Sequence, residues 1–478
     1  PRELREIHLP PVRACVEAGV AGFMAAYNEI DGVYCHANRW LLTELLREEY
    51  GFRGIVMSDG VAIDQLDAMT GDRTVSGAVA LEAGVDMGLW DTGFARLEEA
   101  VERGLVSTAR LEEAVLRILE MKFRRGLFEE PFVTENELWQ GYTPDRYPQV
   151  RELARESMVL LKNEGNLLPL DGTKPLRLLV AGPNADEIYS QLGDYPPPVR
   201  PASGVTVRRG LEQWAAGTPV QVSYAPGCPA FATDPEMIGE AVDTSRLELP
   251  GDQLALLTQL KATGKPVVTV LIQGRPYAME AVAAHSDAVF CCFYPGLTGG
   301  EALAQLLFGE AAPSGRLPVS LPDHVGQLPV YYNYKDSYRG MDYYDARERP
   351  RYGFGSGLTY TTFAYRLLEA PVDAEAENVE ALSLRIAVTN TGHRAASAVP
   401  QLYLHRTQGV VTSRIRALCD FQKLLLAPGE TRTVSLTISR EALSQWDSQM
   451  RQQVLPGKIQ WFLGDCGETY LSGIFTLV

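Results

Sequence analysis

Over the first 130 residues, short apolar runs alternate with longer segments in which apolar residues recur every three or four positions. The runs cover 19–25, 54–57 and 83–87. The segment 111–128 places on one face Leu111, Ala114, Val115, Ile118, Leu119 and Met121, with arginine and glutamate on the other. This spacing predicts an amphipathic helix, and the alternation as a whole predicts βα units around a parallel sheet.

A second alternating region extends over 171–328 and predicts a separate open α/β sheet. Its strand-like runs are 176–181, 267–272 and 288–294, and a helix-like segment covers 301–308. In the last run Cys291 and Cys292 are consecutive, so they face opposite sides of a strand and can pack as small hydrophobic side chains. We expect residues 131–170 to form a packed linker in which 151–163 is helical.

After residue 328 the composition changes twice. Residues 329–360 are crowded with Tyr, Arg, Asp and Gly, which is typical of a surface connection. Over 361–478, short alternating runs are separated by turn signals at Asn390-Thr-Gly392, Ala427-Pro-Gly429 and Asp465-Cys-Gly467. This pattern predicts a β-sandwich. The predicted fold class is therefore multidomain α/β plus all-β.

The composition is that of a globular chain, and it limits the kinds of partner that the chain is expected to bind. With 478 residues, 46% of them hydrophobic and 22% charged, the chain has room for roughly three domains. Its net charge of −16 repels nucleic-acid backbones and anionic lipid surfaces, so we expect neither nucleic acid nor membrane as a partner. The longest apolar runs are far shorter than the roughly 20 residues that span a bilayer.

Cysteine usage and the first residues bear on the compartment. The seven cysteines are scattered without CxxC spacing, which argues against a disulfide framework or a zinc site. No charged-then-apolar leader follows Pro1. This favours a soluble cytoplasmic protein, although a leader cleaved upstream of Pro1 would leave the same sequence. A homo-oligomer is equally compatible with these features.

The segment 51–59 carries the strongest chemical signal. It reads Gly-Phe-Arg-Gly-Ile-Val-Met-Ser-Asp, so a predicted strand ends on Asp59. A carboxylate at the C-terminal edge of a parallel sheet lies where barrel enzymes build their active sites, which makes Asp59 a candidate nucleophile. From position alone the alternative is stronger, because an aspartate directly after a strand commonly caps the next helix.

Ordered motifs along almost the whole chain decide between these alternatives. They are Met24-Ala-Ala-Tyr-Asn28, Asn38-Arg-Trp-Leu-Leu42, Ser58-Asp59, Ser157-Met-Val-Leu-Leu-Lys-Asn163, Pro313-Ser-Gly-Arg-Leu-Pro318, Tyr352-Gly-Phe-Gly355 and Val388-Thr-Asn-Thr-Gly392. In this order and spacing the chain resembles the family 3 glycoside hydrolases. The resemblance implies the C-terminal part of a catalytic (β/α)8 barrel over 1–130, an α/β sandwich domain over 171–328 and a fibronectin-III-like domain over 361–478.

By this resemblance the protein is a retaining, exo-acting β-glycosidase that cuts terminal β-glucosides or β-xylosides through a covalent glycosyl-enzyme on Asp59. Met24 and Tyr27 would line the subsite of the non-reducing sugar, since sugar ring faces need thioether or aromatic surface. A core position on a buried strand is an equal alternative for Met24. Gly60 departs from the family, in which a large residue, often Trp, follows the nucleophile. The side of the leaving group is therefore more open here, or is filled from elsewhere.

Two parts of the family's active site have no counterpart in the sequence. A barrel of eight strands takes about 250 residues, so the front half of the barrel is expected to lie outside this sequence. The family's general acid is a glutamate in a Ser-Gly-Glu-like motif between an apolar strand and a Leu-Pro-Gly turn. Here Leu249-Pro-Gly251 stands without that strand or motif. Neither Glu240 nor Glu248 is assigned the role, and we expect residues to be missing at this point.

The sequence gives less support to a phosphate site or a metal site. The glycine-rich segment 296–300 lacks the P-loop lysine and fits a strand-to-helix turn better than a phosphate site. The six histidines have no metal-binding spacing, so no metal or cofactor is expected. Two other functions stay open. The missing glutamate motif points to a non-catalytic carbohydrate-binding or scaffold protein of the same fold, and a phosphate-ester enzyme using Asp59 would need a metal and a second acidic cluster.

Overall fold

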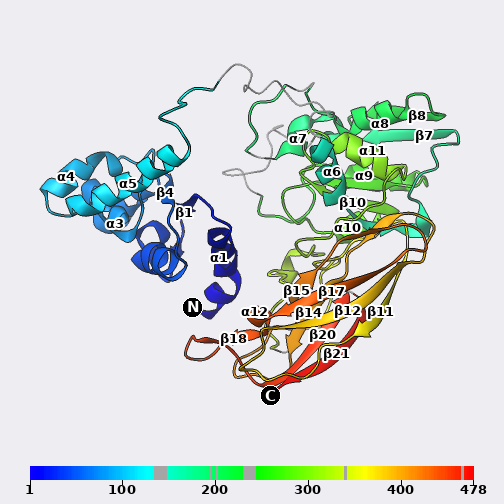
Figure 1. Cartoon of the computed structure of the whole chain (residues 1–478). Helices are drawn as coiled ribbons and strands as arrows, with labels where there is room; N and C mark the ends of the chain where they lie inside the picture. The colour runs from blue at the N-terminus through cyan, green and yellow to red at the C-terminus, as the bar shows by residue number, and fades with distance from the viewer. Residues whose placement is uncertain (134–147, 194, 201–202, 230–243, 338–341, 465–467) are drawn as a thin grey trace. The chain divides into compact units, whose positions relative to one another are not determined.

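The computed structural model describes residues 1–133, 148–193, 195–200, 203–229, 244–337, 342–464 and 468–478. The chain divides into two compact units, Pro1–Gln140 and Gly141–Val478. Figure 1 shows helices around a small sheet in the first unit, and an α/β part and an all-β part in the second. None of the described helices is long and apolar enough to cross a bilayer.

The first unit is built from βα units, as predicted. Its parallel sheet has the order β1-β4-β5, with β1 (Gly22–Ala25), β4 (Ile55–Gly60) and β5 (Met87–Leu89), and a small hairpin joins β2 (Glu29–Ile30) to β3 (Val33–Tyr34). The main helices are α1 (Leu9–Glu17), η3 (Trp40–Glu49), α3 (Arg73–Ala83), α4 (Leu97–Glu102) and α5 (Thr108–Arg124). The helix expected at 111–128 is α5, whose first turn is capped by the Ser107 side chain. The run 83–87 is not a strand for most of its length, because α3 continues until Gly84 ends it at positive φ.

Alternation along β4 separates a core face from an open face. Val56 and Ser58 are fully buried, and Val56 lies in the hydrophobic core of the first unit with residues such as Ile63. Successive residues of a strand point to opposite sides, so Met57 and Asp59 share the other face. The hydrophobic pattern of this strand therefore directs the carboxylate of Asp59 away from the core.

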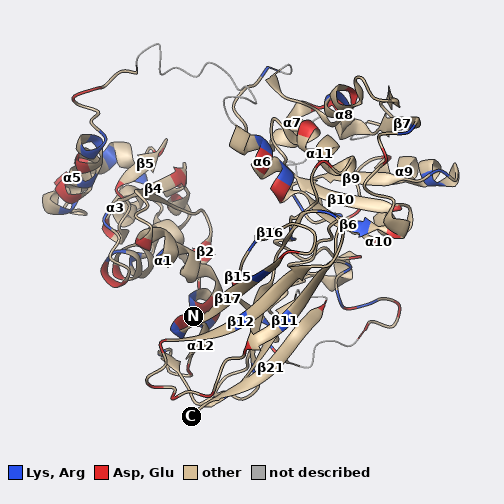
Figure 2. Cartoon of the chain, turned by 45° about the vertical axis from the view of Figure 1, so that its right-hand side comes forward, with Lys and Arg blue, Asp and Glu red and all other residues tan. Residues whose placement is uncertain are grey.

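The α/β part of the second unit contains the expected strands. One sheet has the order β6-β10-β9, and a second pairs β7 with β8. The strands are β6 (Val159–Asn163), β7 (Leu176–Ala181), β8 (Val220–Ala225), β9 (Val268–Ile272) and β10 (Ala288–Phe293), and the helices are α6 (Pro148–Ser157), α7 (Ile188–Leu192), α8 (Val207–Ala215), α9 (Gln253–Ala262), α10 (Glu280–Ala284) and α11 (Gly299–Leu307). In Figure 2, β9 and β10 carry no charged residue whereas α6 carries both signs, as expected for buried strands and a covering helix.

Strand β10 lies between two hydrophobic cores. Its residues from Ala288 to Cys292 are at most 1% exposed. Cys292 packs in one core with Phe290, whereas Cys291 packs in the other with Val289. The prediction that the two thiols face opposite sides and pack as hydrophobic groups is confirmed. Burial raises the pKa of Cys291 to about 12 and also raises that of Cys292, so neither is a reactive thiolate near neutral pH.

The prediction of one helix over 151–163 was wrong in its second half. Helix α6 ends at Ser157, and the chain continues as β6, which pairs with β10 in antiparallel orientation. Residues Met158, Val159 and Leu160 are all fully buried. A short run that is apolar on every side suits a buried helix and a buried strand equally well, and pairing with a distant strand decides between them.

Among the strands that the structure describes, β7 and β9 lie at sheet edges although their sequences suit a sheet interior. Both are nearly continuous apolar runs, as in strands buried on both faces. Among the described strands, however, β7 pairs only with β8 and β9 only with β10, and Leu179 in β7 is 53% exposed. The Asn184 side chain donates a 3.4 Å hydrogen bond to the Ile272 carbonyl, which links the loop after β7 to the end of β9. The expected gap in the sequence falls partly in 230–243, outside the described residues.

The all-β part is the predicted β-sandwich. One sheet has the order β11-β12-β17 and the other β15-β14-β20-β21. The strands are β11 (Phe363–Glu369), β12 (Ala381–Asn390), β14 (Gln401–Arg406), β15 (Ala417–Phe421), β17 (Thr431–Ser439), β20 (Gly457–Gly464) and β21 (Thr469–Leu477), with the short pairs β13 (Ala396–Ala398) with β16 (Leu424–Leu426) and β18 (Ser444–Trp446) with β19 (Gln452–Val454). Inward-facing residues of both sheets, among them Trp461 and Phe475, form a single core.

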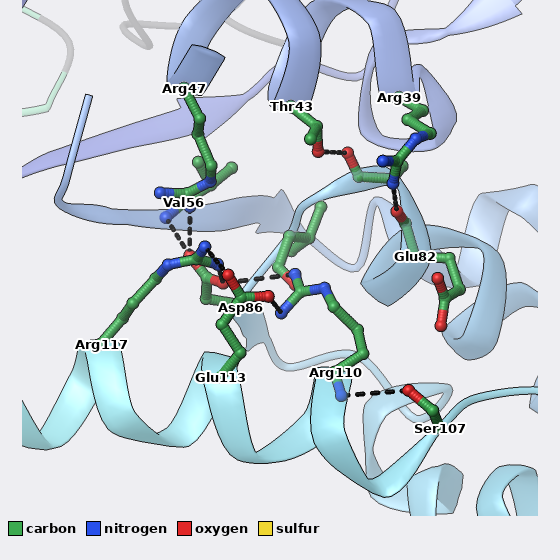
Figure 3. A network of polar contacts seen from close by, with 12 residues as sticks. Arg39, Thr43, Arg47, Val56, Glu82, Asp86, Ser107, Arg110, Glu113 and Arg117 are labelled. Carbon is green, nitrogen blue, oxygen red and sulfur yellow. Dashed lines mark hydrogen bonds and ion pairs between the residues drawn. The ribbon is translucent and has the colours of Figure 1, made fainter. Parts of the chain in front are cut away.

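A buried carboxylate fastens the beginning of β5 to β4 and to two helices (Figure 3). Asp86 directly precedes β5, and its fully buried side chain accepts a hydrogen bond of 3.0 Å from the Val56 amide. The same carboxylate contacts Arg47 of η3 at 2.6 Å. It also contacts Arg117 and Arg110 of α5, at 2.8 and 3.3 Å. These contacts tie the β4–β5 pair to the helices that flank it.

Replacing Asp86 by Asn should destabilise the first unit by roughly 3 kcal/mol or more, because removing one partner of a buried ion pair leaves the other charges uncompensated. Hydrogen–deuterium exchange of the peptide carrying β4 measures this loss within the whole chain. The matched control is Glu113→Gln, since Glu113 pairs with the same two α5 arginines but is 52% exposed, and it should cost less than about 1 kcal/mol. Equal protection in both variants would contradict the prediction.

Candidate active site

Asp59 lies one residue before the C-terminal end of β4 and is half-buried. Its Oδ1 accepts a 2.7 Å hydrogen bond from the Gly60 amide. The helical turn at 63–66 and the short helix α2 (Asp67–Thr70) begin without a side-chain cap, and α3 is capped by Asp72. Asp59 therefore caps none of these three helical segments, which removes the alternative that was stronger from position alone. Its carboxylate is available to a ligand.

Tyr27 reaches the end of β4 from the neighbouring strand. It comes two positions after β1, and the parallel register places Ala25 opposite Ser58, so Tyr27 lies beside the last residues of β4. Its hydroxyl donates a hydrogen bond to the Gly60 carbonyl, and the residue is 37% exposed. The structure thus brings Tyr27 and Asp59 together at one edge of the sheet.

Met24 lies on the same face of the sheet as Asp59, two residues further down the strands. It is in register with Met57, which is in turn in register with Met87, so three methionines form a row across the sheet. Met24 is 56% exposed. Within the described residues Met24 therefore does not pack in a hydrophobic core. The row places polarizable thioether surface next to the position of the carboxylate.

Two buried aspartates hold the loops after β4 and β5 against each other. Asp91, which follows β5, accepts a 2.8 Å hydrogen bond from the Ile63 amide and another from the Ser58 hydroxyl. Asp64, which follows β4, accepts a 2.8 Å hydrogen bond from the Gly93 amide. We call Asp64 and Asp91 the aspartate clasp. Because Ser58 and Ile63 stand on either side of Asp59 in the chain, the clasp fixes the backbone that carries the candidate nucleophile.

The charge of the clasp is balanced by an arginine. Arg73 contacts the carboxylate of Asp64 and, at 2.7 Å, that of Asp67. Burial by itself would raise the pKa of Asp64. Hydrogen bonds from the amides of Gly93 and Thr92, together with the Arg73 charge, outweigh burial and hold the pKa of Asp64 below its ordinary value. Asp64 is therefore an ionised acceptor at neutral pH.

Sequence reasoning missed the residues that follow β5. Trp90 comes directly after the strand, is 81% exposed and has a φ of 65°. Val61, which follows β4, has a φ of 61°. A positive φ is strained for bulky and β-branched side chains, and such strain gathers at functional sites. The available signal was a tryptophan placed at the end of a strand that neighbours the one carrying Asp59.

The general acid stays unassigned. Glu240 lies outside the described residues, and Glu248 is an exposed residue of the second unit. In the part of the chain that the structure describes, no group of three or more His, Cys, Asp or Glu side chains could hold a metal ion.

The glycine-rich turn before α11 serves helix packing. The Gly300 amide donates a 2.9 Å hydrogen bond to the Val205 carbonyl. A Cβ atom on Gly300 would lie 1.9 Å from the Thr206 carbonyl oxygen, and one on Gly210 would lie 2.2 Å from the Gly300 carbonyl. These glycines let α8 and α11 approach backbone to backbone. The interpretation as a strand-to-helix turn is confirmed.

Family models match most of the chain. Residues 1–121 match the glycosyl hydrolase family 3 N terminal domain, 158–360 match the glycosyl hydrolase family 3 C-terminal domain, and 398–465 match a fibronectin type III-like domain. The chain is 34% identical to a periplasmic beta-glucosidase of Salmonella typhimurium, over 98% of this chain and 69% of that protein. It is also 34% identical to a beta-xylosidase of Formosa agariphila, over 95% and 69% of the two chains.

Solved structures share the fold. The beta-glucosidase of Listeria innocua in complex with isofagomine has a TM-score of 0.90 at 29% identity, covering 100% of this chain and 70% of that one. A β-glucosidase of Erythrobacter marinus has a TM-score of 0.90 at 33% identity, covering 98% and 69%. The alignment with the Salmonella protein runs over 536 residues, more than the 478 of this chain. That relative therefore carries residues inside the aligned span that have no counterpart here.

The lowered pKa of Asp64 predicts a pH dependence of stability. Its contribution is present above its unfolded pKa of about 3.9 and is lost as the pH falls through the lower folded value. Asp64→Asn should destabilise the first unit at pH 7 by roughly 1–3 kcal/mol, and the difference from the unaltered protein should shrink at about pH 3. Urea titrations at both pH values, followed by tryptophan fluorescence, test this.

The control is Asp67→Asn, because Asp67 shares Arg73 but its side chain is 34% exposed. At pH 7, Asp67→Asn should destabilise the first unit less than Asp64→Asn does. A stability difference for Asp64→Asn that is the same at both pH values would contradict the assignment.

Proposed function

Because the chain belongs to glycosyl hydrolase family 3, it is a β-glycosidase, and we propose that it releases terminal β-linked sugars with retention, through a covalent intermediate on Asp59. The observation that carries the proposal is the position of Asp59: a half-buried carboxylate at the C-terminal end of a parallel strand, free of any helix-capping role. The relatives include a β-glucosidase and a β-xylosidase, which supports a glucoside or a xyloside as substrate.

The proposed reaction has two displacements at the anomeric carbon. First, a carboxylate oxygen of Asp59 attacks this carbon, the bond to the glycosidic oxygen breaks, and a general acid gives its proton to the departing oxygen. Second, the deprotonated acid takes a proton from water, the water oxygen attacks the same carbon, and the ester bond to Asp59 breaks. Two inversions restore the β configuration. The acid must lie about 5–5.5 Å from the nucleophile, as in other retaining glycosidases.

In this proposal Tyr27 and Met24 bind the terminal sugar. The hydrogen bond from Tyr27 to the Gly60 carbonyl holds the phenol ring beside the nucleophile. Met24, on the same sheet face as Asp59, offers the apolar thioether surface that a sugar ring face requires. Both side chains are partly exposed among the described residues.

Trapping the intermediate tests the nucleophile directly. The full-length protein would be incubated with 2-deoxy-2-fluoro glucosyl and xylosyl fluorides and analysed by peptide mass spectrometry. Fluoride departs with little help from an acid, so this test separates Asp59 from the unassigned acid. We expect the mass of one fluorosugar on the peptide carrying Asp59. An adduct on another carboxylate would reassign the nucleophile, and no adduct together with no hydrolysis of either sugar would favour a sugar-binding protein of the same fold.

The substitution Asp59→Ala should lower turnover of aryl β-glycosides to below about one per cent, the usual consequence of removing a nucleophile. Far-ultraviolet circular dichroism and the unfolding midpoint should stay close to those of the unaltered protein. The control variant Glu112→Gln, which removes an exposed charge on α5, should keep full activity. An Asp59→Ala protein with more than a few per cent of the activity would remove Asp59 from this role.

A further inference from the structure

A buried histidine of the first unit has no part in the proposed reaction. His36 lies in η2 (Cys35–Ala37), the turn that follows the β2–β3 hairpin, and the residue is 0% exposed. The described residues alone enclose it. On either side of it, Tyr34 and Ala37 pack against the core of the first unit. Because η2 is held by this core, a hydrogen bond from His36 fixes the group that accepts it.

The imidazole ring reaches the backbone next to Tyr27. Nδ1 of His36 lies 3.3 Å from the Ala26 carbonyl oxygen. A carbonyl oxygen only accepts hydrogen bonds, so Nδ1 carries the hydrogen and donates it to Ala26. Burial is the largest influence on the pKa of His36 and lowers it, so the ring is neutral at neutral pH. A neutral ring has one N–H group, and this contact uses it.

The main chain of the same turn holds the other side of Tyr27. The Cys35 amide donates a 3.0 Å hydrogen bond to the Asn28 carbonyl. Ala26 and Asn28 are the two neighbours of Tyr27 in the chain, so consecutive residues of η2 fix the backbone on both sides of it. The pairing of β1 with β4 ends at Ala25. Beyond the sheet, η2 therefore supplies the hydrogen bonds that hold this segment.

We propose that His36 is a positioning residue for Tyr27, and that it acts through its hydrogen bond to the Ala26 carbonyl. The inference rests on the proposed function, in which Tyr27 binds the terminal sugar beside Asp59. The Tyr27 hydroxyl donates a hydrogen bond to the carbonyl of Gly60, the residue after Asp59. A shift of the backbone at Ala26 moves the phenol away from this carbonyl, and small displacements of a group that orients a substrate lower the rate strongly.

A double-mutant cycle tests whether His36 acts through Tyr27. His36→Phe keeps a flat ring and removes Nδ1, and Tyr27→Phe keeps the ring and removes the hydroxyl group. The measured quantity is kcat/KM for 4-nitrophenyl β-glucoside and β-xyloside, in the unaltered protein, both single variants and the double variant. Residues that act through one another give non-additive effects, whereas a general loss of stability lowers the activity by the same factor in both backgrounds.

His36→Phe should lower kcat/KM about three- to tenfold when Tyr27 is present, which is the size of one hydrogen bond. In the Tyr27→Phe background the same substitution should change kcat/KM by less than about twofold. An equal factor in both backgrounds, or no loss when Tyr27 is present, would overturn the proposal. If the unfolding midpoint shows that phenylalanine does not fit the buried position, the smaller His36→Leu takes its place in the cycle.

A conservative variant and a matched control complete the test. His36→Asn has an amide group that can donate from the place of Nδ1, so it should recover most of the loss, and an equal loss in both variants would contradict the role of the donor. The control is Thr43→Val, which removes another side-chain hydrogen bond to a carbonyl of the first unit, 2.8 Å long and accepted by Ala83. It should change kcat/KM by less than about twofold. Hydrolysis by the unaltered protein tests the glycosidase separately, and a protein that hydrolyses neither glycoside overturns both proposals.

Discussion

The aspartate clasp is the interaction on which the candidate site depends. Where parallel strands end, the amides beyond the last strand pair have no partner in the sheet, and a buried amide without a partner costs about 1–3 kcal/mol. Asp64 accepts amides from the loop after β5, and Asp91 accepts amides from the loop after β4. Each loop therefore supplies the carboxylate that accepts hydrogen bonds from the amides of the other loop. Asp59 and Trp90 lie where these two loops begin, so the clasp determines the backbone positions of both residues.

The same two strands are fastened at their other end in a different way. There the carboxylate of Asp86 meets three guanidinium groups, from η3 and α5, besides the Val56 amide. The arginine cluster joins the sheet to its helices, whereas the clasp joins one loop to another with mostly neutral donors. In parallel barrels the C-terminal edge of the sheet carries the chemistry and the N-terminal edge carries stability. The two carboxylate networks of this unit follow that division.

The sequence was sufficient where local pattern decides the structure. The amphipathic spacing of 111–128 was enough to predict helix α5, and the apolar run 288–294 was enough to predict strand β10. Because Cys291 and Cys292 are consecutive in that strand, they had to face opposite cores. Local pattern failed for 158–163, because an apolar run with no period becomes a strand only through its pairing with β10. It failed for Trp90 for a similar reason, since the register that sets Leu89 against Gly60 joins distant segments. The proposal that Asp59 is the nucleophile came from the family resemblance, because position alone favoured a helix cap.

The open edges of β7 and β9 bear on the general acid that the reaction requires. Strand β8 pairs with β7 and strand β10 with β9, all in parallel orientation within each pair, and the chain passes from β8 to β9 through the turn Leu249-Pro-Gly251. One more parallel strand between β7 and β9 would pair with both edges and cover Leu179. In the chain it would precede that turn, which is where the resemblance expects an apolar strand followed by the acid's loop, and the Salmonella relative carries additional residues within the aligned span. The loop after such a strand emerges at the C-terminal edge of the sheet. A strand and loop missing at this point would account both for the division of the sheet among the described strands and for the unassigned acid.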